Sequence, residues 1–156
     1  MSIDLAVFRK NYLVVGLPEE EVARVAELAE FCIAYPGRAL IEQGAANADL
    51  LIILDGVVEV HSRTGTLLGE RGPCSVIGEI ALVDNQPRSA SVTAKGTVSY
   101  ALLKAEALRR FMGQNPKIGL LMLSNLARVL AMRLREASST IEDLDGKVGD
   151  PWRFDR

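Results

Sequence analysis

Histidine and cysteine are scarce in this chain of 156 residues, which has one histidine and two cysteines. Cys32 and Cys74 lie far apart, and neither belongs to a Cys-x-x-Cys pair or lies beside His61. A zinc site normally takes several His or Cys ligands, so the sequence predicts no metal site. The two thiols are interpreted as small buried side chains in a reducing compartment.

Long apolar runs are also missing. The longest is Leu50–Leu54, far short of the roughly 20 residues that a membrane-spanning helix needs. The segment Met1–Lys10 mixes acids with bases and lacks the basic start and apolar centre of a signal peptide. The sequence therefore predicts a cytoplasmic protein that makes no membrane contact.

Neither sign of charge dominates the chain. Its 18 lysines and arginines face 20 acidic residues, and the formal net charge is −2. That balance provides no overall positive field for wrapping nucleic acid. Hydrophobic residues make up 49% and charged residues 24%, which is typical of a folded protein whose length suits one domain.

Turn signals and apolar patterns divide the chain into three parts. Residues 1–35 are predicted to be helical, because Pro18 and three glutamates mark a helix start and Pro36-Gly37 a helix end. Residues 38–103 alternate short β-rich runs with glycines, which favours a sandwich or small barrel. Residues 104–144 are predicted to form a short helix followed by a long one, which ends before a polar tail at 147–156.

Within the β-rich part, Asp55-Gly56 separates the apolar runs Leu50–Leu54 and Val57–His61. An Asp-Gly pair between two such runs predicts a β-hairpin. The other predicted strands are Arg38–Glu42, Thr66–Glu70, Ser89–Ala94 and Val98–Leu103.

A regular apolar stripe follows the predicted long helix, with alternating spacings of three and four residues. Its members are Leu120, Leu123, Ala127, Leu130, Leu134, Ala137, Ile141 and Leu144. Such spacing is the heptad seam of a coiled coil. A helix packed on its own barrel is the alternative. Because the stripe runs through almost the whole helix, a homodimer seam is the preferred interpretation.

One segment contains most of the side chains that could bind a ligand. Gly78-Glu79-Ile80-Ala81-Leu82 leads through a short loop to Pro87-Arg88-Ser89-Ala90. A short helical turn exposes backbone N–H groups that suit an anion, and Arg88 can offer a planar fork to two phosphate oxygens. Ser89 adds a hydroxyl, and the carboxylate of Glu79 suits a sugar hydroxyl. The set predicts a site for a phosphorylated ribose; an ordinary Glu79–Arg88 ion pair is the alternative.

This segment resembles the phosphate-binding cassette of cyclic nucleotide-binding domains. That cassette typically reads Phe-Gly-Glu, an aliphatic residue, Ala or Gly, Leu, a variable loop, Pro-Arg, a small residue and Ala. The resemblance extends over residues 13–139 and departs at Ile77, where the family has an aromatic residue. It implies an α+β fold, an antiparallel β-roll or jelly-roll barrel with an N-terminal helix and a long C-terminal helix. A single domain over residues 1–146 is expected.

The resemblance also implies roles for the cassette residues. Glu79 accepts a hydrogen bond from the ribose 2′-OH, and Arg88 pairs with the exocyclic oxygens of the cyclic phosphate. Ser89 holds that phosphate or contacts the base. Gly78 lets the backbone approach the sugar, since a side chain there would obstruct it. The backbone N–H groups near Ile80 and Ala81 complete the phosphate site.

Residues beyond the cassette are expected to contact the base. Alignment with the bacterial catabolite activator family places Ala137 and Ser138 there. Arg133 either reaches back toward Glu79 or the phosphate, or is a solvated helix charge. Trp152 either caps the base or packs on the domain, as a tail aromatic commonly does.

The function implied by the resemblance is a receptor for a cyclic nucleotide, with cAMP preferred over cGMP. No catalysis and no further cofactor are expected, because one histidine and no clustered carboxylates offer no phosphodiesterase site. The chain has no room for a helix-turn-helix after the long helix, so no DNA binding by this chain alone is expected. A stand-alone homodimeric sensor acting on an unknown downstream protein is predicted; a ligand-free interaction or dimerisation module is the alternative.

Overall fold

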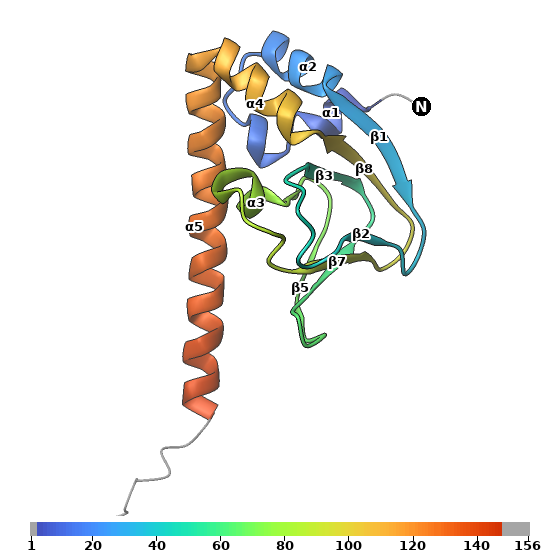
Figure 1. Cartoon of the computed structure of the whole chain (residues 1–156), viewed down its shortest axis with the longest axis vertical. Coiled ribbons are helices and arrows are strands. Elements are labelled where there is room, and N and C mark those ends of the chain that lie inside the picture. Colours follow the sequence, from blue (N-terminus) through green and yellow to red (C-terminus); the bar gives the residue numbers. More distant parts are fainter. Residues whose placement is uncertain (1–2, 148–156) are drawn as a thin grey trace, which may run out of the picture.

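Two four-stranded antiparallel sheets lie face to face, with helices at one end and a long helix along one side (Figure 1). This computed structural model describes residues 3–147 of the chain. The arrangement confirms the predicted β-roll with an N-terminal helix and a long C-terminal helix, α5 (Pro116–Lys147). None of the described helices is both long enough and apolar enough to cross a membrane.

The first sheet has the strand order β1-β8-β3-β6 and the second the order β2-β7-β4-β5. The strands of the first sheet are β1 (Ala29–Ala34), β8 (Val98–Leu103), β3 (Leu50–Asp55) and β6 (Val76–Ile77). Those of the second are β2 (Ala39–Ile41), β7 (Ser91–Ala94), β4 (Val58–His61) and β5 (Leu67–Arg71).

Strand β3 lies between two apolar cores, and for this reason all of Leu50–Leu54 is buried. Its alternate side chains Leu51 and Ile53 join the core between the two sheets. Leu50, Ile52 and Leu54 join a second core under the helices. Because both faces of this strand are covered, its sequence is a continuous apolar run rather than an alternating one.

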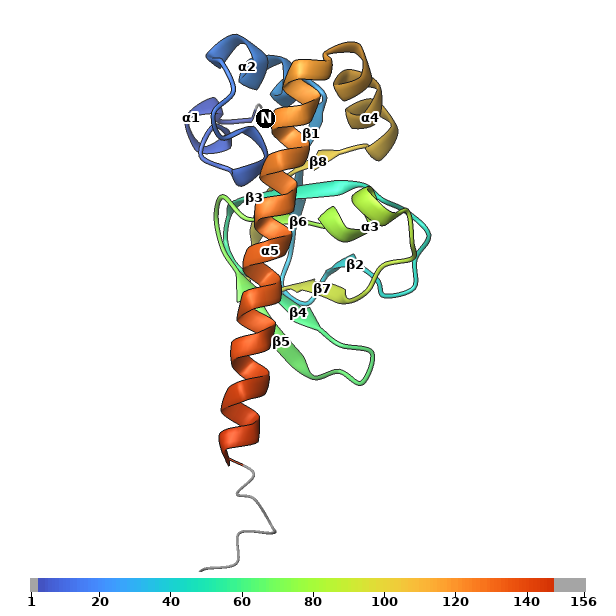
Figure 2. The ribbon, with the colours of Figure 1, turned by 90° about the vertical axis from the view of Figure 1, so that its left-hand side faces the viewer.

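The second core is covered by helices from both ends of the chain. They are α1 (Leu5–Phe8), the 3₁₀ turn η1 (Tyr12–Val14), α2 (Glu19–Glu27), α4 (Ala105–Gln114) and the first half of α5. Figure 2 shows α5 leaving this helical end and running past α3 and the second sheet. Asn125 of α5 donates to the carbonyls of Leu13 and Val15, which fixes the helix against η1.

The predicted helical segment 1–35 is wrong at its end. Helix α2 ends at Glu27, and Ala29–Ala34 forms β1, paired antiparallel to β8. Alanines at helical spacing mimicked a longer helix, whereas Phe31, Cys32 and Ile33 gain more from pairing with the sheet. At the other end of the chain, α5 continues through Gly146 to Lys147 rather than ending at residue 144.

The hairpin predicted at Asp55-Gly56 is also wrong. Strand β3 pairs with β8 and β6, whereas β4 pairs with β5 and β7, so the chain passes from one sheet to the other at this turn. Gly56 has a φ of +86° and lies against Thr97. A turn is present at Asp55-Gly56 as predicted, but a turn residue does not specify which strands pair with each other.

Candidate functional site

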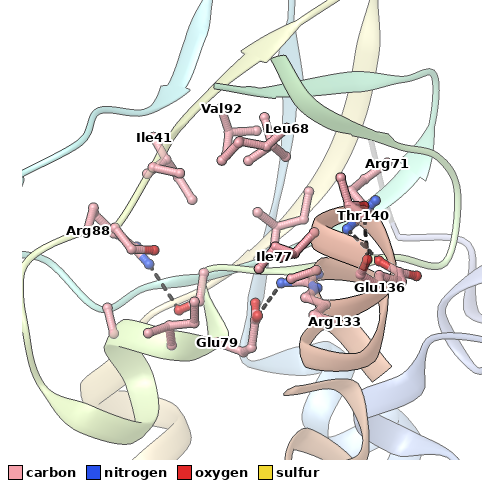
Figure 3. A pocket seen from close by; sticks show the side chains of 18 residues that line it. Ile41, Leu68, Arg71, Ile77, Glu79, Arg88, Val92, Arg133, Glu136 and Thr140 are labelled. Carbon is pink, nitrogen blue, oxygen red and sulfur yellow. Dashed lines mark hydrogen bonds and ion pairs between the residues drawn. The ribbon is translucent and has the colours of Figure 1, made fainter. Parts of the chain in front are cut away.

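A cavity of about 470 Å³ opens between α3 (Glu79–Asp84), the second half of α5 and the second sheet (Figure 3). Its walls combine an apolar surface with a few charged groups, the usual make-up of a small-molecule site. The apolar side chains come mainly from the sheets: Ile41, Val60, Leu68, Ile77 and Val92. The charged ones are Arg71, Glu79, Arg88, Arg133 and Glu136.

Gly78 immediately precedes helix α3, and its φ of +91° lies in the left-handed region that favours glycine. A Cβ at this position would lie 2.5 Å from Nη1 of Arg88 and 2.9 Å from the carbonyl oxygen of Asp49. Gly78 is therefore required both by its backbone conformation and by the close approach of Arg88. The predicted glycine, short helix and arginine loop are all found here.

Arg88 is buried, with 4% of its surface exposed, and four contacts hold its guanidinium. Nε and Nη2 donate to Oδ1 of Asn47 at 3.1 and 2.6 Å. Nη2 also donates to the Asp49 carbonyl, and Nη1 to the Gly78 carbonyl at 3.0 Å. Since arginine has five N–H donors, one on Nη1 is left for a ligand. The two-pronged fork expected from the sequence is thus already occupied along the Nε–Nη2 edge.

Burial lowers the pKa of Arg88 below its ordinary value, while the nearby carboxylates of Asp49 and Glu79 act in the opposite direction. Desolvation is the larger influence because the guanidinium has left water. A bound anion would restore part of the lost charge stabilisation, so this buried cation is suited to a phosphate.

Glu79 is 1% exposed and faces the same cavity. Its Oε1 forms an ion pair with Nη1 of Arg133 on α5, and Nη2 of Arg133 donates to the carbonyl of Val76. Its Oε2 is buried without a hydrogen-bond partner among the described residues. An unpaired buried carboxylate oxygen is costly, and a ligand hydroxyl would satisfy it.

These contacts decide two of the alternatives left open by the sequence. The partner of Glu79 is Arg133, so Glu79 and Arg88 do not form the ordinary ion pair with each other. Arg133 reaches back toward Glu79, so it is not a solvated helix charge.

The cassette residues predicted from the sequence come together at the cavity. Gly78, Glu79, Ile80, Ala81, Arg88, Ser89 and Arg133 all line it. Ser138 does not: it is exposed, and its hydroxyl donates to the carbonyl of Leu134 at 3.0 Å. Ala137 lines the cavity with a methyl group. Trp152 and Phe154 lie outside the described residues.

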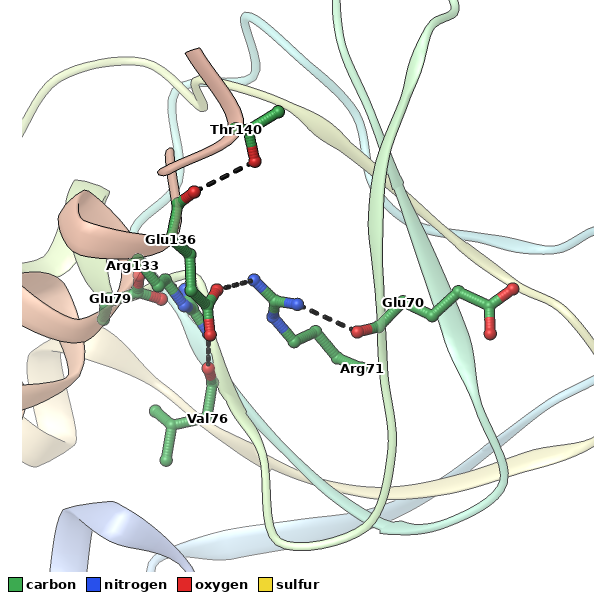
Figure 4. A network of polar contacts seen from close by, with 7 residues as sticks. All are labelled: Glu70, Arg71, Val76, Glu79, Arg133, Glu136 and Thr140. Atoms are coloured by element: carbon green, nitrogen blue, oxygen red, sulfur yellow. Dashed lines mark hydrogen bonds and ion pairs between the residues drawn. The ribbon is translucent and has the colours of Figure 1, made fainter. Parts of the chain in front are cut away.

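Sequence reasoning missed the polar residues that line the cavity away from the cassette. Arg71 of β5 donates from Nη2 to Oε2 of Glu136 on α5 at 3.1 Å (Figure 4). The hydroxyl of Thr140 donates to the Glu136 carbonyl at 3.0 Å. Glu136 and Thr140 are one turn apart on the helix face that carries Arg133, which is the signal that could have found them. Arg71 offers no such local signal.

The sequence profile described as "Cyclic nucleotide-binding domain" matches residues 34–115, just over half of the chain. The chain belongs to the cyclic nucleotide-binding domain family. A crystal structure of a cyclic nucleotide-binding domain from Methylobacillus flagellatus has the same fold, with a TM-score of 0.80 and 29% identity. The match covers 94% of this chain and 84% of that one.

Two longer proteins also contain a segment similar to this member of the family. Glutaminase 2 of Bradyrhizobium diazoefficiens is 29% identical over 130 residues, which are 83% of this chain and 21% of that protein. The CRP-like cAMP-activated global transcriptional regulator of Mycobacterium tuberculosis is 31% identical over 112 residues, 69% of this chain and 48% of that protein. The chain thus spans less than half the length of either relative.

Proposed function

We propose that this chain is a cytoplasmic receptor for cAMP that binds the nucleotide in the cavity between α3 and α5 and performs no chemistry on it. The observation that carries the proposal is Oε2 of Glu79, which is buried and has no hydrogen-bond partner among the residues that the structure describes. A ribose 2′-OH would donate to this oxygen while Oε1 keeps its ion pair with Arg133.

The phosphate is proposed to lie against the start of α3 and the remaining N–H of Arg88. Ile80 and Ala81 supply backbone N–H groups there, and Ser89 supplies a hydroxyl; all three line the cavity. Charge-assisted hydrogen bonds of this kind are shorter and stronger than neutral ones. The buried cation at Arg88 supports an anionic ligand, and the carboxylate at Glu79 supports a neutral sugar hydroxyl beside it.

The choice of cAMP over cGMP is supported by the M. tuberculosis relative, whose name describes activation by cAMP. The Arg88-Ser89-Ala90 sequence is compatible with either nucleotide. The competing proposal is a family member that has lost its ligand and acts only as an interaction module. The intact Glu79 and Arg88 favour the receptor.

Ligand control of a homodimer is proposed to run through α5. Most members of the apolar stripe from Leu120 to Leu144 are exposed, and two of them, Ala137 and Ile141, line the cavity. A ligand that contacts this end of the helix would favour one helix position over another, which is a population shift. The response would be passed to a downstream protein.

Calorimetric titration with cAMP and cGMP tests the proposal. The wild-type protein is expected to bind cAMP more tightly than cGMP, and Arg88→Ala is expected to weaken cAMP binding by about 2–4 kcal/mol. Arg63→Ala is the matched control, because Arg63 is exposed in the β4–β5 turn and lies outside the cavity lining. Unchanged affinity in Arg88→Ala would contradict the phosphate role, and no binding of either nucleotide would favour the interaction module.

A further inference from the structure

The loop between β2 and β3 surrounds the arginine of the cassette. Arg88 lies at the wall of the cavity (Figure 3), and its backbone pairs with this loop. The amide of Gly44 donates to the carbonyl of Arg88 at 2.9 Å, and the amide of Arg88 donates to the carbonyl of Ala45 at 3.0 Å. The guanidinium donates to the side chain of Asn47 and to the carbonyl of Asp49. Four residues of the loop therefore contact Arg88, three through their backbone and Asn47 through its side chain.

Asp49 ties this loop to the helical end of the fold. Its Oδ1 accepts a hydrogen bond from the backbone N–H of Ala105, the first residue of α4, at 3.0 Å. Its Oδ2 forms an ion pair with Nζ of Lys104 at 3.2 Å. The carboxylate of Asp49 is thus engaged at the start of α4, and its backbone carbonyl is what contacts Arg88. The loop is anchored on both sides of Asn47.

Asn47 occupies the edge of the guanidinium that can bind two phosphate oxygens at once. Its Oδ1 accepts from Nε of Arg88 at 3.1 Å and from Nη2 at 2.6 Å. Of the two N–H groups on Nη1, one donates to the carbonyl of Gly78 at 3.0 Å, and the other is left for a ligand. Asn47 itself is not part of the cavity lining, so its effect on a ligand passes through Arg88.

An asparagine binds this edge and leaves the positive charge of Arg88 unneutralised. An amide oxygen and a carboxylate oxygen can accept the same two hydrogen bonds, but a carboxylate would also neutralise the guanidinium. It would then repel an anion that approached the other side of Arg88. With Asn47 in place, the guanidinium is fixed in orientation and its charge stays available to an anion.

We propose that Asn47 is a positioning residue for an anionic ligand: its neutral amide oxygen fixes the Nε–Nη2 edge of Arg88 and directs the free N–H of Nη1 toward the phosphate. The inference rests on the proposed cyclic nucleotide function, and it adds a residue that lies outside the cassette motif. Asn47 is exposed, so a substitution there releases Arg88 while removing little buried contact.

Calorimetry with cAMP on the wild-type protein, Asn47→Ala and Asn47→Asp tests the inference. Asn47→Ala is expected to weaken binding about tenfold, because the guanidinium loses two hydrogen bonds and becomes free to turn. Asn47→Asp keeps an acceptor oxygen in the same place, yet it is expected to weaken binding more, by about 30-fold, because its carboxylate competes with the phosphate for Arg88. Urea unfolding of the ligand-free proteins should show Asn47→Asp to be at least as stable as the wild type, since the new carboxylate pairs with a buried cation.

Ala46→Asp is the matched control, since Ala46 is an exposed residue of the same loop and lies outside the cavity lining. It adds the same charge without the contact to Arg88, and affinity for cAMP should fall by less than about threefold.

A merely structural role for Asn47 predicts a different order of affinities. Asn47→Asp would then bind cAMP as tightly as the wild type, because its hydrogen bonds to Arg88 survive. That result would overturn the inference, and so would unchanged affinity in Asn47→Ala; both leave the receptor proposal standing. A wild-type protein that binds neither cAMP nor cGMP would overturn the proposed function itself.

Discussion

At the scale of the residue, Arg88 occupies space that a side chain at position 78 would need. A Cβ of residue 78 would lie 2.5 Å from Nη1 of the guanidinium, and Asn47, Asp49 and Gly78 itself supply the acceptors of Arg88. Glycine at position 78 therefore serves the position of the arginine as well as the turn into α3. The cassette works as one packed unit rather than as separate ligand contacts.

Gly78→Ala is expected to destabilise the fold by about 1–3 kcal/mol, because it forces a left-handed backbone and a clash with Arg88 and the Asp49 carbonyl. It should also weaken cAMP binding by displacing Arg88. Urea unfolding measures the first effect and calorimetry the second. Gly96→Ala is the control: a Cβ there meets nothing within 4 Å, so both measurements should stay near wild type.

At the scale of the element, local signals in the sequence predicted where the chain turns and where strands and helices lie. Glycine and proline turns marked most strand ends. The cassette could be predicted because its residues are contiguous from Gly78 to Ala90. Which strands pair with each other could not be predicted from the sequence. The Asp55-Gly56 turn connects two different sheets, and only the pairing of β3 with β8 reveals this.

The site residues also divide into those that a local motif predicts and those that only the fold brings together. Glu79 and Arg88 could be predicted because they lie nine positions apart in one motif. Arg71 could not, since its partner Glu136 is far along the chain and meets it only when α5 crosses the edge of the second sheet. The short strand β6 was missed for a related reason: two residues, Val76 and Ile77, carry too little pattern to predict a strand.

At the scale of the whole molecule, α5 has two apolar faces. One face, with Met122, Leu126 and Val129, is buried against the rest of the chain. The other is the heptad stripe, on which Leu120 and Leu134 are 71% and 69% exposed. Leu120, Leu134 and Leu144 are exposed rather than packed on the chain's own barrel, whereas Ala137 and Ile141 line the cavity beside it. A row of exposed leucines at heptad spacing supports the proposed homodimer.

The double substitution Leu123→Glu with Leu134→Glu is expected to produce a monomer, because it places charges in the proposed seam without touching the buried face of α5. Light scattering should give the mass of two chains for the wild-type protein and of one for the variant. Arg135→Glu changes the charge of an exposed residue outside the stripe, and it should stay dimeric. A wild-type protein that is monomeric with and without cAMP would contradict the seam.

The most direct measurement of the whole account compares the affinities of cAMP and 2′-deoxy-cAMP, which differ by the single hydroxyl assigned to Oε2 of Glu79. The wild-type protein is expected to bind cAMP about 10- to 100-fold more tightly, and Glu79→Ala to bind the two alike. Equal affinities in the wild-type protein would contradict the claim that this buried oxygen, which has no partner in the described part of the chain, binds the sugar hydroxyl.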